Sequence, residues 1–213
     1  MRPFSFGGNM IIYRDDEIVV CEKLFGVSSQ KSDKDNMVDR LKELLGGEIY
    51  PVHRLDTQTT GLMVYARTEK SASVLSRQIQ DGVLQKEYLC LCHGPVPQNG
   101  EMVDFLYHDR LKNKSFVVKT KRAGAKAARL KFEVISQKQA GECGLSLVKV
   151  KLFTGRTHQI RVQFSFRGYP LYGDGKYGAK DNAKIHLHSC YLSFAHPKTA
   201  EEIEFSSTPE WAR

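Results

Sequence analysis

The sequence has no long hydrophobic run, and no segment approaches the roughly 20 consecutive apolar residues that a membrane-spanning helix requires. The N-terminus lacks the continuous apolar stretch of a secretory signal, so we expect a cytoplasmic protein with no membrane role. Cysteine is scarce and scattered, with five residues in 213, which is typical of a reducing compartment. Repeats, coiled-coil heptads and low-complexity linkers are also missing, so we expect one domain over residues 1–213.

Metal and cofactor motifs are weak. Cys90-Leu91-Cys92-His93 lies in an apolar run, and Cys-x-Cys without a second pair is not a tetrahedral zinc pattern, so core packing is favoured. Residues 173–178 match the G-x-G-x-x-G dinucleotide pattern, but no clear parallel strand precedes them and no apolar helix follows. We therefore expect neither a metal nor a cofactor.

Acidic residues are outnumbered, and this indicates the class of partner. The chain has 32 Lys and Arg against 24 Asp and Glu, a formal net charge of +8. Such an excess commonly marks a polyanion partner, here RNA or DNA ahead of acidic lipid. The densest positive charge, over residues 112–131, surrounds Phe116 and could grip phosphate, although an ordinary solvated hairpin explains it equally well.

Hydrophobic periodicity and turn residues predict a chain of mixed secondary structure. Residues 10–21 are expected to form a hairpin, residues 36–45 a helix that Gly46-Gly47 ends, and Thr68 the cap of a helix that ends at Gly82. High β content with helices outside strict alternation predicts an α+β fold, a mixed and largely antiparallel sheet flanked by helices. Further strands are expected at residues 61–66, 84–93, 101–107, 116–120, 128–135 and 145–153.

The segment 53–61 has the strongest signature of a chemical site. Arg54 and Asp56 lie in this segment among polar, turn-forming residues, immediately before an apolar strand. Loops anchored by a rigid sheet are where catalytic groups are usually displayed. Asp56 is therefore the candidate catalytic carboxylate, with Arg54 as its cationic companion.

A second polar window follows the strand at 145–153 and contains Arg156, His158 and Arg161. A strand-to-helix turn there would offer backbone N–H groups to anions. Alternatively, the charged side chains of this window only form surface salt bridges. If Arg161 meets Asp56 in space, it would hold the carboxylate ionised, which suits a nucleophile. The periodicity leaves helix or strand open, because alternate residues from Ile160 onward are apolar but Thr154-Gly155 is typical of a helix entry.

Lys86 and Tyr88 begin the strand expected at 84–93. The phenol ring of Tyr88 could stack on a nucleobase, although most strand tyrosines simply pack in the core or at its rim.

Together these segments resemble the RluA-type family of RNA pseudouridine synthases. The hallmark is His-Arg-Leu-Asp followed by a Thr-rich turn and Gly-Leu, and the similarity extends from Met10 to the C-terminus in the expected order. Two positions depart from it: Lys23-Leu24-Phe25-Gly26 replaces the usual Lys-Pro-Ala-Gly type of turn, and Gln163 replaces a histidine. The family's motifs are matched by residues 53–62, 86–89, 155–161, 169–174, 177–178 and 187–197.

The resemblance implies isomerisation of specific uridines to pseudouridine in structured rRNA or tRNA, without a cofactor or metal. The N-glycosidic bond breaks, the uracil turns, and its C5 rejoins the ribose. It also implies the pseudouridine synthase fold, with a catalytic cleft across the sheet and a helix at residues 157–167. Many family members carry an N-terminal S4 module, which the few residues before Met10 cannot hold, and we expect a monomeric catalytic domain.

The resemblance further assigns roles to single residues. Asp56 would act on the sugar, either by attack on C1′ or through a glycal route. Its role is similar to that of the carboxylate of a retaining glycosidase. Tyr88 would lie against the uracil and Arg161 would pair with Asp56, while Arg54 would fill the gap left by the flipped base. The residues expected to bind RNA are Arg54, His53, Arg156, His158, Leu187 and Lys86.

Two other functions compete with this one. A non-catalytic RNA-binding or chaperone protein would tolerate Asp56→Asn, but the intact Asp56, Tyr88 and Arg161 disfavour it. A glycosylase or nuclease would need an activated water or a metal constellation, and the sequence shows neither.

Overall fold

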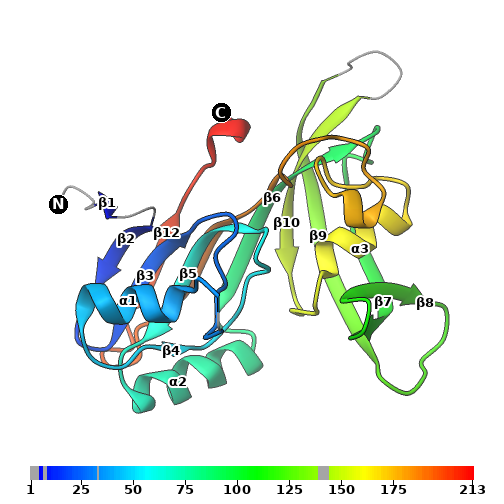
Figure 1. Ribbon diagram of the computed structural model, residues 1–213. Coiled ribbons are helices and arrows are strands. Elements are labelled where there is room, and N and C mark those ends of the chain that lie inside the picture. The colour runs from blue at the N-terminus through cyan, green and yellow to red at the C-terminus, as the bar shows by residue number, and fades with distance from the viewer. Residues whose placement is uncertain (1–4, 7–8, 33, 139–143) are drawn as a thin grey trace. The chain divides into compact units, whose positions relative to one another are not determined.

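The structure, a computed structural model, describes residues 5–6, 9–32, 34–138 and 144–213. The chain forms two units (Figure 1). Unit 1 combines Met1–Lys86 with His188–Trp211, and unit 2 comprises Glu87–Leu187. Unit 1 is therefore assembled from two stretches that are far apart in sequence, and each unit is described by itself below.

Unit 1 is built on a mixed sheet. The predicted hairpin at its start is present, because Asp15 Oδ1 accepts hydrogen bonds from the backbone N–H of Glu17 (2.7 Å) and Ile18 (2.8 Å) and closes the turn. Neighbouring strands are antiparallel except for β5 and β11, which are parallel. In sheet order the strands are β1 (Ser5–Phe6), β2 (Asn9–Arg14), β3 (Ile18–Lys23), β5 (Thr60–Ala66), β11 (Leu187–Ala195) and β12 (Glu202–Ser206), while β4 (Tyr50–Pro51) also pairs with β5.

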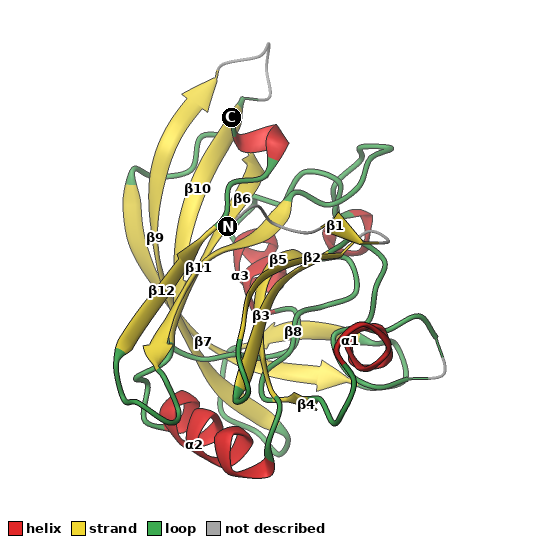
Figure 2. Ribbon diagram, turned by 90° about the vertical axis from the view of Figure 1, so that its left-hand side faces the viewer, coloured by secondary structure: helices red, strands yellow, loops and turns green. Residues whose placement is uncertain are grey.

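Two capped helices flank this sheet, as predicted. The side chain of Asn36 caps α1 (Met37–Leu45) by accepting the Asp39 N–H, and Thr68 caps α2 (Glu69–Gln80) by accepting the Ser71 N–H. Figure 2 shows the two helices on either side of β3 and β5. A short 3₁₀ helix, η2 (Glu210–Ala212), follows β12.

The core of unit 1 forms around β5, which is buried at every residue after Thr60. Burial of an aliphatic side chain stabilises a fold by about 1.5–3 kcal/mol, so this strand is a rigid base for the loop that enters it. One face of the core joins β3, β5, α2, β11 and the segment after α2 through Ile18, Val20, Leu62, Val64, Ala66, Leu75, Leu84, Leu192 and Phe194.

Unit 2 is an antiparallel sheet, and all five strands predicted for it are present. Buried and exposed residues alternate along β9, as expected for a sheet with one covered face. The helix α3 (Gln159–Phe166) and the 3₁₀ helix η1 (Gly175–Tyr177) contribute to a core cluster with β7 and β9 through Val162 and Tyr177. In sheet order the strands are β6 (Gln85–His93), β10 (Leu145–Leu152), β9 (Ala125–Lys138), β7 (Asn99–Asp109) and β8 (Lys114–Val118).

The α3 segment resolves the ambiguity in the sequence. It is a helix, so the strand alternative is wrong and the helix expected from the family is present, beginning at Gln159. The six residues from Gln159 to Phe164 are all buried. These six residues cover all sides of the helix, so this part of the sequence carries no helical hydrophobic period.

The architecture confirms the predicted α+β class with a mixed, largely antiparallel sheet. Within the described residues, no helix is long and apolar enough to cross a membrane. The action of residues 1–213 as one catalytic domain stays a prediction.

Candidate active site

The loop that carries Asp56 runs from β4 to β5 in unit 1. Its side chains alternate: Leu55 is buried, whereas Arg54 is exposed and Asp56 is half-buried. The Thr59 N–H donates to the Asp56 carbonyl oxygen at 2.9 Å and closes a turn. The turn fixes the backbone of Asp56 and leaves its carboxylate partly accessible.

Ser29 anchors the loop at Leu55. The buried Ser29 hydroxyl donates to the Leu55 carbonyl oxygen at 2.8 Å and accepts the Leu55 N–H at 3.2 Å. The phenol of Tyr65, itself fully buried on β5, donates to the Ser29 carbonyl oxygen at 2.8 Å. The residue before Asp56 is thus connected to the core strand by hydrogen bonds.

Lys23 anchors the loop on the other side of Asp56. This fully buried lysine donates to the carbonyl oxygens of Leu24 (2.9 Å), Val27 (2.9 Å) and Thr57 (3.2 Å), and so satisfies the three N–H bonds of its ammonium group. Burial lowers the pKa of Lys23 to about 8, and the negative charge of Asp56 opposes this shift. The segment that departs from the family pattern therefore still ties its lysine to the candidate catalytic loop.

His53 is held neutral beneath the loop. Its Nε2 accepts the Val64 N–H at 3.1 Å, so the ring proton lies on Nδ1. Burial, followed by the positive charge of Lys86, lowers the pKa of His53 well below its usual value. His53 Nδ1 has no hydrogen-bond partner among the described residues. Burial also lowers the pKa of Lys86 itself.

A chain of hydrogen bonds reaches Thr60 at the start of β5. His188 Nδ1 lies 2.8 Å from Thr60 Oγ1, and His188 Nε2 lies 3.1 Å from Ser207 Oγ. The Ser207 hydroxyl donates to Glu22 Oε2 at 3.0 Å, so it accepts from His188 Nε2–H, and Thr60 in turn donates to Nδ1. Burial lowers the pKa of His188 to about 4, which keeps this neutral tautomer in place.

In unit 2, Arg161 makes a buried, two-pronged ion pair with Asp174. Its Nε lies 2.7 Å from Asp174 Oδ2 and its Nη2 2.8 Å from Oδ1, and both residues are 2% exposed. The guanidinium carbon lies 5.1 Å from the centre of the Tyr177 ring. Asp174 was not among the predicted site residues, because it belongs to the glycine-rich segment that was rejected as a cofactor site. The match of residues 169–174 to a family motif could have indicated it.

The other candidates of unit 2 have distinct surroundings. His158, at φ +56 just before α3, is hydrogen-bonded through Nδ1 to the Tyr177 hydroxyl (2.9 Å), which also accepts the Ser115 N–H at 2.8 Å. Arg156 donates from Nε to the Ala127 carbonyl oxygen at 2.9 Å. Tyr88 on β6 and Leu187 at the start of β11 are both buried, 5% and 4% exposed.

The structure therefore groups the predicted residues into two sets. Unit 1 holds His53, Arg54, Asp56 and Lys86, whereas unit 2 holds Tyr88, Arg156, His158, Arg161 and Leu187. Pairing of Arg161 with Asp56 stays a prediction. No group of three or more His, Cys, Asp or Glu side chains that could hold a metal occurs within the described residues.

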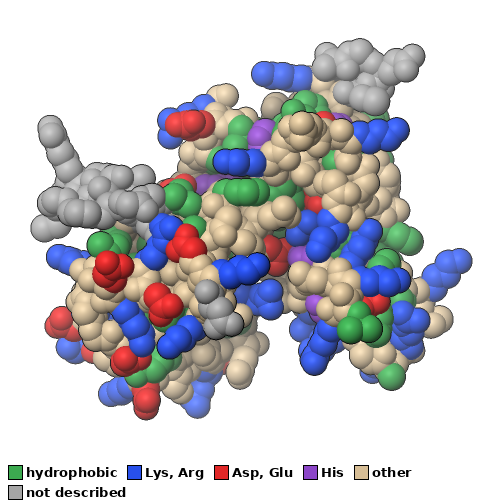
Figure 3. Space-filling model, viewed as in Figure 1, with side chains coloured by type: hydrophobic (Ala, Val, Ile, Leu, Met, Phe, Trp, Pro, Cys, Tyr) green, Lys and Arg blue, Asp and Glu red, His purple; other side chains and the backbone are tan. Residues whose placement is uncertain are grey.

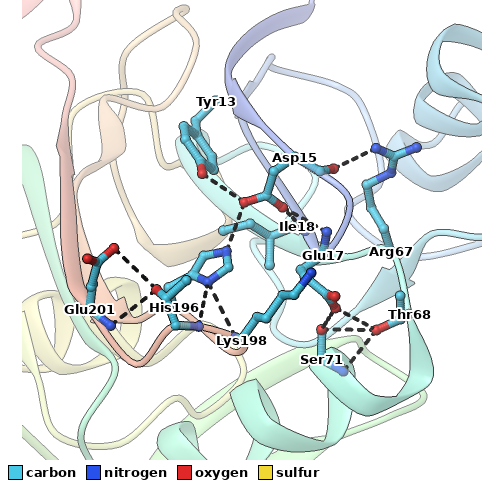
Figure 4. Close-up of polar contacts among 11 residues, drawn as sticks. Tyr13, Asp15, Glu17, Ile18, Arg67, Thr68, Ser71, His196, Lys198 and Glu201 are labelled. Carbon is cyan, nitrogen blue, oxygen red and sulfur yellow. Dashed lines mark hydrogen bonds and ion pairs between the residues drawn. The ribbon is translucent and has the colours of Figure 1, made fainter.

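A further polar cluster, around Asp15 and His196, serves the fold of unit 1 (Figure 4). His196 Nε2 lies 2.8 Å from Asp15 Oδ2, while His196 Nδ1 accepts the backbone N–H groups of Lys198 and Thr199. Both ring nitrogens are thus used, and Asp15 also receives the Tyr13 hydroxyl at 2.7 Å. Burial opposes the Asp15 charge, but the hydrogen bonds outweigh it and lower the pKa of Asp15. A cluster with its polar atoms committed in this way clamps the hairpin turns and offers little to a substrate.

Comparison with known proteins shows the family. A family model described as RNA pseudouridylate synthase matches residues 17–166. This chain belongs to the RluA-type family of RNA pseudouridine synthases. It is accordingly an isomerase of the pseudouridine synthase type.

Individual relatives cover most of the chain. It is 31% identical to the dual-specificity RNA pseudouridine synthase RluA of Vibrio vulnificus, over 89% of this chain and 78% of that protein. It is 28% identical to tRNA pseudouridine synthase C of Haemophilus ducreyi, over 92% and 89%. The human protein RNA pseudouridylate synthase domain containing 1 has the same fold, with a TM-score of 0.79, 24% identity and coverage of 98% of this chain and 86% of its own. The predicted pseudouridine synthase fold is thereby confirmed.

Proposed function

We propose that this pseudouridine synthase modifies specific uridines in structured tRNA or rRNA, and that Asp56 is the carboxylate that acts on the ribose. The observation that carries the proposal is the loop itself: Ser29, Lys23 and His188 restrain Leu55, Thr57 and Thr60, while Asp56 keeps a partly accessible carboxylate. A catalytic group gains from such restraint because it is held near the reacting atom without further ordering.

The reaction requires no net redox change. The bond from C1′ to N1 breaks, C5 of the turned uracil bonds to C1′, and the hydrogen on C5 leaves as a proton while N1 gains one. We propose that Asp56 stabilises or attacks C1′ during this exchange and that Arg161 pairs with it. Tyr88 and Leu187 would contact the uracil, and the exposed Arg54 would occupy the gap left by base flipping.

Two further assignments belong to the same proposal. RNA contacts would come from His53, Arg54, Lys86, Arg156 and His158, in a monomeric catalytic domain that acts in the cytoplasm. The names of the relatives support tRNA and rRNA as substrate classes, since one is called a tRNA pseudouridine synthase and another a ribosomal large subunit pseudouridine synthase.

Pseudouridine mapping in cells that lack the protein would test the proposal. Cells would be rescued with wild type, Asp56→Ala or the matched control Asp16→Ala, which removes an exposed carboxylate in unit 1. We expect wild type and the control to restore the same sites and Asp56→Ala to restore none, a loss on the order of 10³-fold or more. The activity would be contradicted if no pseudouridine site depended on the wild-type protein. Release of free uracil would indicate a glycosylase. Full rescue by Asp56→Ala would show that the carboxylate is not required.

A further inference from the structure

A groove of about 340 Å³ lies in unit 2, between β8, α3 and η1. None of the residues predicted to be catalytic or to bind RNA lines it, although Tyr177, which contacts His158 and Arg161, forms part of its wall. Its lining includes Lys114, Phe116, Val117, Val162, Phe166 and Tyr177. The groove is therefore apolar and aromatic, with one cationic side chain and no acidic one among its lining residues.

Two phenylalanine rings of this groove face solvent. Phe116 is 36% exposed and Phe166 is 59% exposed, although burial of either ring would be favourable. The guanidinium carbon of Arg167 lies 6.0 Å from the centre of the Phe166 ring. Accessible rings beside cations are the stacking platforms that single-stranded nucleic acids use.

Hydrogen bonds fix the shape of the groove before any ligand arrives. The Tyr177 hydroxyl accepts the Ser115 N–H of β8 at 2.8 Å, and the Ser165 hydroxyl of α3 donates to the Tyr177 carbonyl oxygen at 2.6 Å. Lys176 also donates to the Asn113 carbonyl oxygen at 3.0 Å and ties η1 to the β7–β8 turn. A preformed groove lowers the entropic cost of binding.

Lys114 supplies a positive charge at the aromatic surface. Its ammonium nitrogen lies 5.2 Å from the centre of the Tyr177 ring and 5.9 Å from that of Phe116. The charge therefore lies close enough to both rings to attract the phosphate of a nucleotide whose base stacks on Phe116.

The segment 110–131, which includes β8, carries the whole positive excess of the chain. It has nine Lys and Arg and no Asp or Glu, whereas the other 23 Lys and Arg face 24 Asp and Glu. Arg129, which pairs with Glu101, is the one residue of the nine with an ion pair in the described part of the chain. Figure 3 shows Lys and Arg side chains gathered over the β7–β8 hairpin, with hydrophobic side chains between them.

We propose that this groove binds a single-stranded segment of the RNA substrate, with bases stacked on Phe116 and Phe166 and a phosphate held by Lys114. The proposal rests on the proposed function, which supplies RNA as the ligand. Charge decides between RNA and a protein partner, because a purely apolar partner would offer no counter-charge to the eight cations of segment 110–131 other than Arg129. RNA-modifying enzymes need such contacts, since unstacking a target base must be offset by binding elsewhere.

Equilibrium binding of a fluorescent oligo(C) strand of about 12 nucleotides would test the groove, because this probe has no uridine for the active site and fits usual single-strand site sizes. We expect Phe116→Ala and Phe166→Ala each to weaken binding by about 5- to 150-fold, the range for loss of one stacked base. Lys114→Gln should reduce the slope of log affinity against log salt by about 0.7, the value for one phosphate contact on a single strand. A duplex of the same length should lose little affinity in the phenylalanine variants.

The controls are Ile135→Ala, an exposed apolar residue of β9, and Lys70→Gln, an exposed lysine of α2; both should bind oligo(C) as wild type does. The proposal is overturned if the phenylalanine variants match Ile135→Ala. It is also overturned if they change the sedimentation coefficient without changing RNA affinity, because the groove would then join proteins. Pseudouridine formation by wild type separates the groove proposal from the proposed function. If wild type is active but the phenylalanine variants bind oligo(C) normally, only the groove proposal is rejected. If wild type is inactive but these variants bind oligo(C) more weakly, only the proposed activity is rejected.

Discussion

Both carboxylate oxygens of Asp174 bind the guanidinium of Arg161, 13 residues earlier in the chain, and the two side chains are almost completely buried. A buried pair of this kind owes its stability to mutual compensation, because each charge alone would be far less stable in the protein than in water. The arginine proposed to meet Asp56 therefore has a structural partner that fixes its orientation.

Asp174→Asn should destabilise the protein by about 3–5 kcal/mol, because it removes the carboxylate charge that binds the buried guanidinium through both oxygens. Urea unfolding would measure this loss. The matched control is Glu101→Gln, which breaks the more exposed pair with Arg129 and should destabilise the protein much less. The double variant Arg161→Met/Asp174→Leu should recover most of the stability without recovering pseudouridine formation. Equal losses in Asp174→Asn and Glu101→Gln would contradict the role assigned to the buried pair.

Lys23→Met should loosen the candidate catalytic loop. The methionine fills similar space but leaves three carbonyl oxygens without the ammonium donor, so the free energy of unfolding should fall by about 1–3 kcal/mol. Because Asp56 itself remains, kcat should fall by less than about tenfold. Lys31→Met, at an exposed position of the same unit, serves as the control. A Lys23→Met protein as stable as this control would show that the anchor is dispensable.

His188 should make the stability of the protein sensitive to acid. The pKa of His188 is about 4 in the folded protein because of burial, against about 6.5 in an unfolded chain. Between these values the unfolded chain binds a proton that the folded protein does not, so the free energy of unfolding decreases as pH falls from 6.5 to 4. The full contribution is about 3 kcal/mol. Urea unfolding at pH 7 and pH 4.5 should show a smaller decrease for His188→Gln than for wild type, and identical decreases would reject the assignment.

Gly61→Ala should damage the contact between β5 and β11. The new Cβ would lie 2.3 Å from the Ser189 carbonyl oxygen, and Gly61 has φ +110, which non-glycine residues adopt at a cost. We expect a loss of about 3 kcal/mol or more in thermal unfolding. Gly26→Ala is the control, because Gly26 has φ +89 but no atom within 4 Å of the added Cβ, so it reports backbone strain alone. Equal losses in the two variants would mean that the strands can move apart at little cost.

Local signals predicted much of the fold because they act over a few residues. Thr68 caps a helix where expected, the helix predicted over residues 36–45 begins after Asn36, and the turn closed by Asp15 makes the first hairpin. The strand β11 was not predicted as a strand; its residues are buried on both faces of the sheet, so its sequence lacks the alternation that marks a half-exposed strand.

Polar contacts between residues that are far apart in the sequence could not be predicted from local sequence patterns. Lys23 was noted only as the first residue of a turn that departs from the family pattern, and only the fold brings it to the Thr57 carbonyl oxygen. His188 and Thr60 are likewise joined across more than half the chain. Family resemblance supplied the residues expected to act, but the groups that hold them follow from tertiary packing.

The assembly of unit 1 from Met1–Lys86 and His188–Trp211 has a consequence for folding during synthesis. When β5 leaves the ribosome, its pairing at Thr60 and Gly61 with His188 and Ser189 of β11 must wait for more than 120 further residues, roughly 6 to 25 s of translation. During that interval the edge of β5 stays open to pairing with a neighbouring nascent chain. Slow translation between residues 87 and 187, or a high local concentration of nascent chains, should therefore increase aggregation of this enzyme even though the stability of the mature fold is unchanged.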